Sequence, residues 1–219
     1  MNFELMANSF PLLLAGAAIT VEITAMSVTF GLLIGCMIGI ARLCSIKPLR
    51  YFANVYVDFI RGTPLLVQIF LVYFALPNII GSRVDPFVAA ISACSINSGA
   101  YVAEIFRSGI MSIDNGQFEA ARSLGLNYRQ TMIQVILPQA FKNVLPALAN
   151  EFIVLLKETS ISGYIGLNEL TRGGDIIRSI TYDPMLPLFG VALIYLVLVV
   201  ILSSLVKKLE RRLRSNERH

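Results

Sequence analysis

Residues 9–41 read SFPLLLAGAAITVEITAMSVTFGLLIGCMIGIA, an apolar run with a single charge, at Glu22. A helix needs roughly 20 apolar residues to cross a bilayer, so this run is longer than one span requires. We therefore expect a transmembrane helix within Ser9–Ala41, with its first turns outside the bilayer or along its interface. Because the apolar residues are continuous and do not alternate, the run is typical of a helix and not of a barrel strand.

Three glycines in this run predict a close helix contact. Gly31, Gly35 and Gly39 recur at four-residue spacing, so they share one face of the helix. A glycine face lets another helix approach closely, and we expect it to pack against a neighbouring span or another chain.

The bulk composition excludes a soluble globular domain. The 219 residues are 56% hydrophobic and only 15% charged, which is too little charge to cover a water-exposed surface. The net charge of +4 comes from basic residues beside apolar runs, a pattern of membrane proteins, so we expect contact with membrane lipid and no nucleic-acid partner.

Four further apolar runs complete the predicted architecture. They lie at Phe52–Leu76, Pro86–Phe106, Val135–Leu156 and Pro187–Val206. The sequence thus predicts an all-α, polytopic membrane protein with five transmembrane helices, forming one domain over residues 1–219.

The basic residues predict the orientation of these helices. Five spans put the two termini on opposite sides, and the side with more Lys and Arg is cytoplasmic. One side holds four basic residues: Arg83, Lys157, Arg172 and Arg178. The other holds thirteen: Arg42, Lys47, Arg50, Arg107, Arg122, Arg129, Lys142, Lys207, Lys208, Arg211, Arg212, Arg214 and Arg218. We therefore expect the N-terminus outside and the C-terminus in the cytoplasm.

The loop between the third and fourth spans carries signals for two short helices. Residues 112–130 read SIDNGQFEAARSLGLNYRQ. Asp114 with Gln117 predicts a capping box, and Gly125 is a typical residue just after a helix end. Asn127 with Gln130 repeats the start signal. We expect a short helix, a glycine turn and a second helix that leads into the membrane.

The same loop carries a family resemblance. Glu119-Ala120-Ala121, then Gly125, then residues 135–138 (VILP) resemble the EAA loop of binding-protein-dependent ABC importer permeases, with Val135 where the pattern has Ile. Three more blocks resemble the polar amino-acid branch of that family. They are residues 58–68 (DFIRGTPLLVQ), 100–107 (AYVAEIFR) and 156–160 (LKETS).

The resemblance implies the type I ABC importer permease fold, with a cytoplasmic coupling region at residues 112–138. In that family the short helix docks in a groove of the ATPase subunit, which makes five residues the expected coupling positions: Glu119, Ala120, Ala121, Arg122 and Gly125. Small alanines permit close docking, a Glu can pair with a basic groove and a glycine permits the turn.

The implied assembly lies in the cytoplasmic (inner) membrane of a prokaryote. It contains two ABC ATPase subunits, an extracytoplasmic solute-binding protein, and a second permease chain that is either identical or related. The sequence leaves open whether the dimer is homo- or heteromeric and whether the binding protein is free or lipid-anchored.

Nothing in the sequence predicts catalysis by this chain. No Gly-Lys dipeptide occurs, so there is no phosphate-binding loop. The lone histidine is the last residue, His219, and no cluster of acids or cysteines has the spacing of a metal site. We expect no enzyme activity, metal or cofactor in this chain, with ATP and Mg bound by the partner ATPase subunits.

Two polar residues fall near the bilayer midplane. Asn97 lies about 17 Å along the third span from Pro86, and Glu151 about 14 Å along the fourth from Lys142. An ionisable group there is costly unless it meets water, a partner or a substrate. Glu151 is the leading candidate for binding the solute, with Asn97 and Ser98 as polar neighbours.

A carboxylate at the midplane favours a cationic amino acid such as arginine, lysine or histidine. Glu151 could instead pair with another buried group or be protonated, and a glutamine- or glutamate-type solute stays open. An ATP-independent transporter or channel would leave the docking helix unexplained, and the missing catalytic constellation counts against a membrane-embedded enzyme. We interpret two charged pairs three residues apart, Glu104–Arg107 and Asp58–Arg61, as structural.

Overall fold

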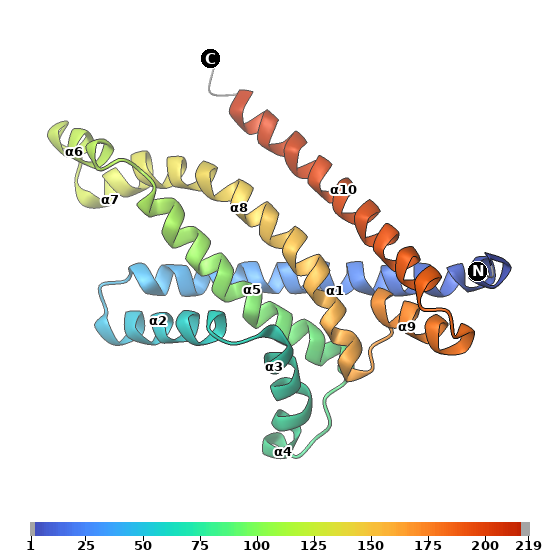
Figure 1. Ribbon diagram of the computed structural model, residues 1–219. Helices are drawn as coiled ribbons and strands as arrows, with labels where there is room; N and C mark the ends of the chain where they lie inside the picture. Colours follow the sequence, from blue (N-terminus) through green and yellow to red (C-terminus); the bar gives the residue numbers. More distant parts are fainter. Residues whose placement is uncertain (1–2, 216–219) are drawn as a thin grey trace.

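The computed structural model describes the backbone of residues 3–215 and the side chains of residues 9–208 (Figure 1). Arg218 and His219 lie outside the described residues, as do the side chains of Arg211, Arg212 and Arg214. The described chain is helical, which confirms the predicted all-α class. Its α-helices are α1 (Phe3–Leu43), α2 (Lys47–Arg61), α3 (Leu65–Phe70), α4 (Leu76–Ile80), α5 (Pro86–Met111), α6 (Asn115–Ser123), α7 (Tyr128–Thr131), α8 (Leu137–Glu158), α9 (Leu170–Thr181) and α10 (Met185–Ser215).

Three of these helices are long and apolar enough to cross a membrane, among the residues the structure describes. They comprise Ser9–Leu43, Pro86–Met111 and Met185–Lys208, and α2 with the helical segment Leu65–Ile80 makes a fourth if the pair is one broken span. Helix α8 lies where the fourth span is predicted and has the predicted length. Its charged and amide side chains lower its mean hydropathy, so it is not among the helices that could cross a membrane by length and composition alone. The count of five spans therefore stays a prediction.

The predicted second span is not one continuous helix. Helix α2 ends at Arg61, a new helical segment starts at Leu65, and the two meet at 105°. The break falls at Gly62-Thr63-Pro64. Proline has no N–H to continue a helix and disfavours helical geometry in the residue before it, so the chain turns there. The apolar pattern of residues 52–76 alone does not reveal this bend.

Two prolines also follow π-helical turns. The turn Leu71–Ala75 precedes Pro77 in α4, and the turn Met132–Ile136 precedes Pro138 in α8. The proline ring clashes with the carbonyl one turn earlier, and a wider π turn relieves the clash while the helix continues. The predicted fourth-span start, Val135, thus lies within a π turn.

Helix α5 lies at the centre of the fold and packs along α1. Its apolar span is two-thirds buried, whereas only 11% of the α10 span is buried within the chain. The predicted glycine face of α1 makes this contact: Gly31 lies against Ser98, Gly35 against Val102 and Gly39 near Phe106. The prediction of close helix packing is confirmed.

Replacing Gly35 by alanine should destabilise the α1–α5 contact. An added Cβ would lie 2.4 Å from a Val102 methyl and 2.9 Å from the Gly99 carbonyl oxygen, so backbone must move. Overpacking of this kind costs about 1–3 kcal/mol. Gly39→Ala is the matched control, because its Cβ would meet nothing closer than 3.7 Å. Thermal unfolding in detergent should show a lower midpoint for Gly35→Ala only, and equal midpoints would contradict this packing.

Candidate coupling helix and solute site

The predicted short helix after the third span is α6, and its start differs in detail from the prediction. The Asp114 carboxylate accepts a hydrogen bond from the Gly116 N–H at 2.6 Å. The predicted capping box with Gln117 does not form, because the Gln117 side chain instead accepts from Gln139 Nε2 at 3.3 Å. The second predicted box is confirmed: Asn127 and Gln130 each accept a 2.9 Å bond from the other's N–H.

Helix α6 ends in the glycine turn that the sequence predicts. Gly125 has φ +87°, in the left-handed region that favours glycine. Its N–H donates to the Arg122 carbonyl, and the Leu126 N–H donates to the Ala121 carbonyl. This pair of bonds is a Schellman motif, which satisfies two carbonyls at the helix end. The Arg122 guanidinium adds a 2.8 Å bond to the Leu126 carbonyl and holds the turn closed.

The expected coupling residues divide between two faces of α6. Ala121 is buried at 4% exposure and fixes the helix to the rest of the chain. Glu119, Ala120 and Arg122 are exposed, and so is Leu124, at 84%. Helices α6 and α7 lie together at one end of the molecule, beyond the membrane-length part of α5 (Figure 1). The exposed face is thus available for a partner.

A charged cluster joins three helices at the same end of α5. Glu104 of α5 accepts bonds from Arg107 and from Arg42 of α1, the latter at 2.6 Å, and Arg61 of α2 lies 3.8 Å away. The predicted Glu104–Arg107 pair is therefore confirmed. The predicted Asp58–Arg61 pair is wrong, since no such ion pair forms in the described chain and Arg61 turns toward Glu104 and the Tyr101 ring. The packing of α2 on α5, through Val57 and Ile60 against Ala100 and Ala103, places Arg61 at this position.

The three predicted solute residues lie near one another but have different surroundings. Glu151 of α8 is partly buried beside the Ser98 hydroxyl of α5, within electrostatic reach of Arg61 and Glu158. The Ser98 hydroxyl does not meet the carboxylate with hydrogen-bond geometry and is left without a partner. The Glu151 carboxylate and the Ser98 hydroxyl therefore lie side by side, and both are free to bond to a further polar group.

Asn97 is already engaged. Its Nδ2 donates to Gln68 Oε1 at 3.0 Å, and it is 3% exposed. Gln68 Nε2 in turn donates to the carbonyl of Ile60, near the end of α2, and to the carbonyl of Thr63, within the break, at 2.8 and 3.1 Å. The Gln68–Asn97 pair thus holds the bend in the second span.

Sequence reasoning missed three residues whose side chains join separate parts of the fold or cap a helix. Gln68 and Arg42 were not singled out, because their partners lie far away in sequence. Glu169, also missed, is fully buried and caps α9 by accepting 2.7 Å bonds from the N–H groups of Thr171 and Arg172. Between Glu158 and Asp183 the chain forms the 3₁₀ segment Thr159–Ile165 and α9.

Comparisons with known proteins bear on the whole chain. Residues 27–215 match the family model described as binding-protein-dependent transport system inner membrane component. The chain is 42% identical over 217 residues to the arginine transport system permease protein ArtQ of Bacillus subtilis (strain 168), with 99% of each covered. It is 41% identical over 207 residues to the glutamine transport system permease protein GlnP of Escherichia coli (strain K12), with 94% of each covered.

A solved structure agrees with these relatives. A chain from the crystal structure of an amino acid ABC transporter with histidines has a TM-score of 0.92 to this one and 47% sequence identity. The match covers 97% of this chain and 99% of that one.

Removing the charge of Glu104 should destabilise the junction of α1, α2 and α5. Glu104→Gln leaves three arginines near one another without their shared carboxylate, and we expect a loss of about 2 kcal/mol. Asp175→Asn is the matched control: Asp175 also pairs with two arginines, Arg172 and Arg178, but these groups are exposed. Thermal unfolding should show a lower midpoint for Glu104→Gln than for Asp175→Asn. An equally low midpoint in the control would contradict the prediction that the Glu104 cluster stabilises this junction.

Proposed function

Because this chain belongs to the family of binding-protein-dependent transport system inner membrane components, we propose that it is the permease subunit of an ATP-driven importer for polar amino acids. The main support is the length of the resemblance: the family match and the relatives extend over nearly the whole chain and are not limited to the EAA loop. A channel or an ATP-independent transporter would have no use for the exposed face of α6.

The proposed solute is a cationic amino acid, with Glu151 as its charged ligand and Ser98 as a polar neighbour. Support comes from the partly buried carboxylate and the unpartnered hydroxyl at one place on α5 and α8. Asn97 has a different proposed role, holding Gln68. The relatives include permeases named for arginine and for glutamine, so a glutamine- or glutamate-type solute is the alternative.

The proposed pathway runs along α8 and is completed by a second permease chain. Helix α8 presents Asn143, Asn150 and Glu151 at least partly exposed along its length. Such groups are costly against lipid and are tolerated beside water or another protein. This supports counting α8 as a span, and hence five spans with the N-terminus outside and the C-terminus cytoplasmic.

The proposed coupling runs through α6, as part of the coupling region 112–138. Two ATPase subunits, which bind ATP and Mg, would each receive one α6, while a solute-binding protein delivers the amino acid on the opposite side. Glu119 and Ala120 would contact the ATPase, Ala121 would anchor the helix, and Arg122 with Gly125 would hold its end.

Neutralising Glu151 should abolish uptake of the cationic solute. In proteoliposomes holding the full complex, Glu151→Gln should lower ATP-dependent arginine uptake at least tenfold, because the loss of one charge contact costs more than about 1.4 kcal/mol. Glu22→Gln is the control, an exposed carboxylate in α1 away from Ser98. Normal arginine uptake by Glu151→Gln would make Glu151 structural, and ATP-independent uptake by the wild type would refute the importer itself.

Straining the turn after α6 should uncouple ATP hydrolysis from transport. Gly125→Ala places a Cβ in the left-handed region, at a cost of about 1 kcal/mol, and should lower solute-stimulated ATPase activity. Gly81→Ala is the matched control, because Gly81 has φ +72° and equally open surroundings but lies after α4. Equal ATPase activity in the two variants would argue against coupling through this turn.

A further inference from the structure

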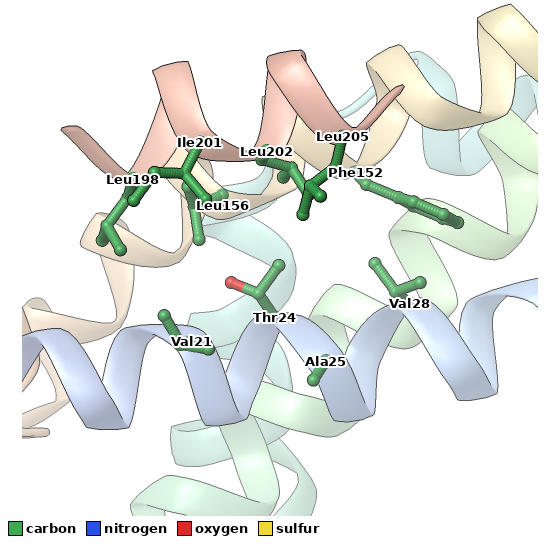
Figure 2. A pocket seen from close by; sticks show the side chains of 10 residues that line it. All are labelled: Val21, Thr24, Ala25, Val28, Phe152, Leu156, Leu198, Ile201, Leu202 and Leu205. Carbon is green, nitrogen blue, oxygen red and sulfur yellow. The ribbon is translucent and has the colours of Figure 1, made fainter. Parts of the chain in front are cut away.

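A cavity of about 290 Å³ lies between α1, α8 and α10. Figure 2 shows side chains of α1 and α10 pointing toward one another from opposite sides, with Phe152 and Leu156 contributed by α8. No polar atom faces the cavity. Its one hydroxyl-bearing residue, Thr24, donates to the Thr20 carbonyl at 2.7 Å. The cavity therefore offers nothing to a water molecule or a polar solute.

The volume of the cavity indicates that its occupant is a hydrocarbon chain and not a helix. Its lining on α1 runs from Val21 to Val28 and on α10 from Leu198 to Leu205, about 10 Å along each helix. A helix 10–12 Å across would need roughly 800–1,200 Å³ over that length. An apolar cavity of about 150 Å³ holds one benzene, so this one suits about a dozen carbon atoms.

The surroundings of the cavity match a phospholipid in depth and charge. The cavity opens onto the exposed apolar surface of α10, where Ile201 and Leu205 are more than half exposed. Lys207 and Lys208 follow directly and are exposed. Leu198 lies about 14 Å from Lys207 along the helix, close to half of the roughly 30 Å hydrocarbon core. Basic residues at the end of a span attract anionic headgroups.

We propose that this cavity binds one acyl chain of an anionic phospholipid whose headgroup lies at Lys207 and Lys208. The lipid belongs to the leaflet that the C-terminal end of α10 reaches, which is the cytoplasmic leaflet in the orientation proposed above. Phe152 lines the cavity and follows Glu151 directly in α8, so a bound chain supports the helix that carries the proposed solute ligand.

Native mass spectrometry of the purified complex, incubated with equal amounts of phosphatidylglycerol and phosphatidylcholine, tests this site. The wild type should retain one phosphatidylglycerol for each copy of this chain. Ala25→Phe fills the cavity and should lower retention at least fivefold. Ala18→Phe is the matched control, two turns earlier on α1, exposed and outside the lining.

A second pair of variants tests the headgroup without altering the cavity. Lys207→Gln with Lys208→Gln should weaken phosphatidylglycerol binding about 30-fold. Lys47→Gln with Arg50→Gln, an exposed basic pair on α2, should leave it unchanged. Equal retention in test and control variants, or no preference for phosphatidylglycerol, would overturn the proposal.

Two further results would separate the lipid proposal from a dimer contact and from the proposed transport function. Covalent dimers of an Ala25→Cys chain, above the wild-type yield, would show that a second copy covers the cavity and would overturn the lipid assignment. The lipid count requires neither ATP nor amino acid. A complex that retains lipid but fails to import amino acids would therefore refute the proposed function and leave the lipid site standing.

Discussion

A chain that bends inside a membrane must find hydrogen-bond partners for the carbonyl groups that the bend releases, because lipid supplies none. Here the side chains of Thr63 and Gln68 meet that demand, and the Thr63 hydroxyl donates to the carbonyl of Phe59 at 3.0 Å. Gln68 donates to the carbonyl of Ile60 near the end of α2 and to the carbonyl of Thr63 within the break, and Asn97 of α5 donates to its side-chain oxygen. These contacts join the end of α2, the break and α5 through one side chain.

The contacts at the α6 end of α5 connect the exposed helix to the interior. Helix α5 continues from the Glu104 cluster to Met111, and α6 follows after three residues. Glu104 binds arginines from α1 and α5 and lies near one from α2, so one carboxylate links three helices at the end of α5 that leads to α6. Arg61 belongs to this cluster and also lies within electrostatic reach of Glu151. The coupling region and the candidate solute site are thus joined by adjacent charged groups.

Local signals in the sequence predicted local structure well. The capping residues Asp114 and Asn127, the turn at Gly125 and the glycine face of α1 all lie where the sequence placed them. The bend at Gly62-Thr63-Pro64 was missed because the apolar residues on both sides of it were counted as one span, although Gly62 and Pro64 are local signals for a break. The partner of Asn97 could not be predicted, since Gln68 is 29 residues away and reaches Asn97 only after the bend has formed. Glu151 was placed beside Ser98 by depth alone, whereas the convergence of Arg42 and Arg61 on Glu104 required the tertiary fold.

The glycine face of α1 also has a consequence for biosynthesis. Gly35 packs against Val102, which a ribosome reaches 67 residues later, about 3 to 13 seconds at ordinary rates of translation. Thr20 and Thr24 bond to carbonyls of their own helix, so α1 enters the bilayer with these hydroxyls already satisfied. The three glycines of this face have no side chain to cover their backbone, and α5 covers it. Until α5 is inserted, they form a bare backbone surface that another nascent helix can approach, so the order of synthesis leaves α1 open to mispairing for that interval.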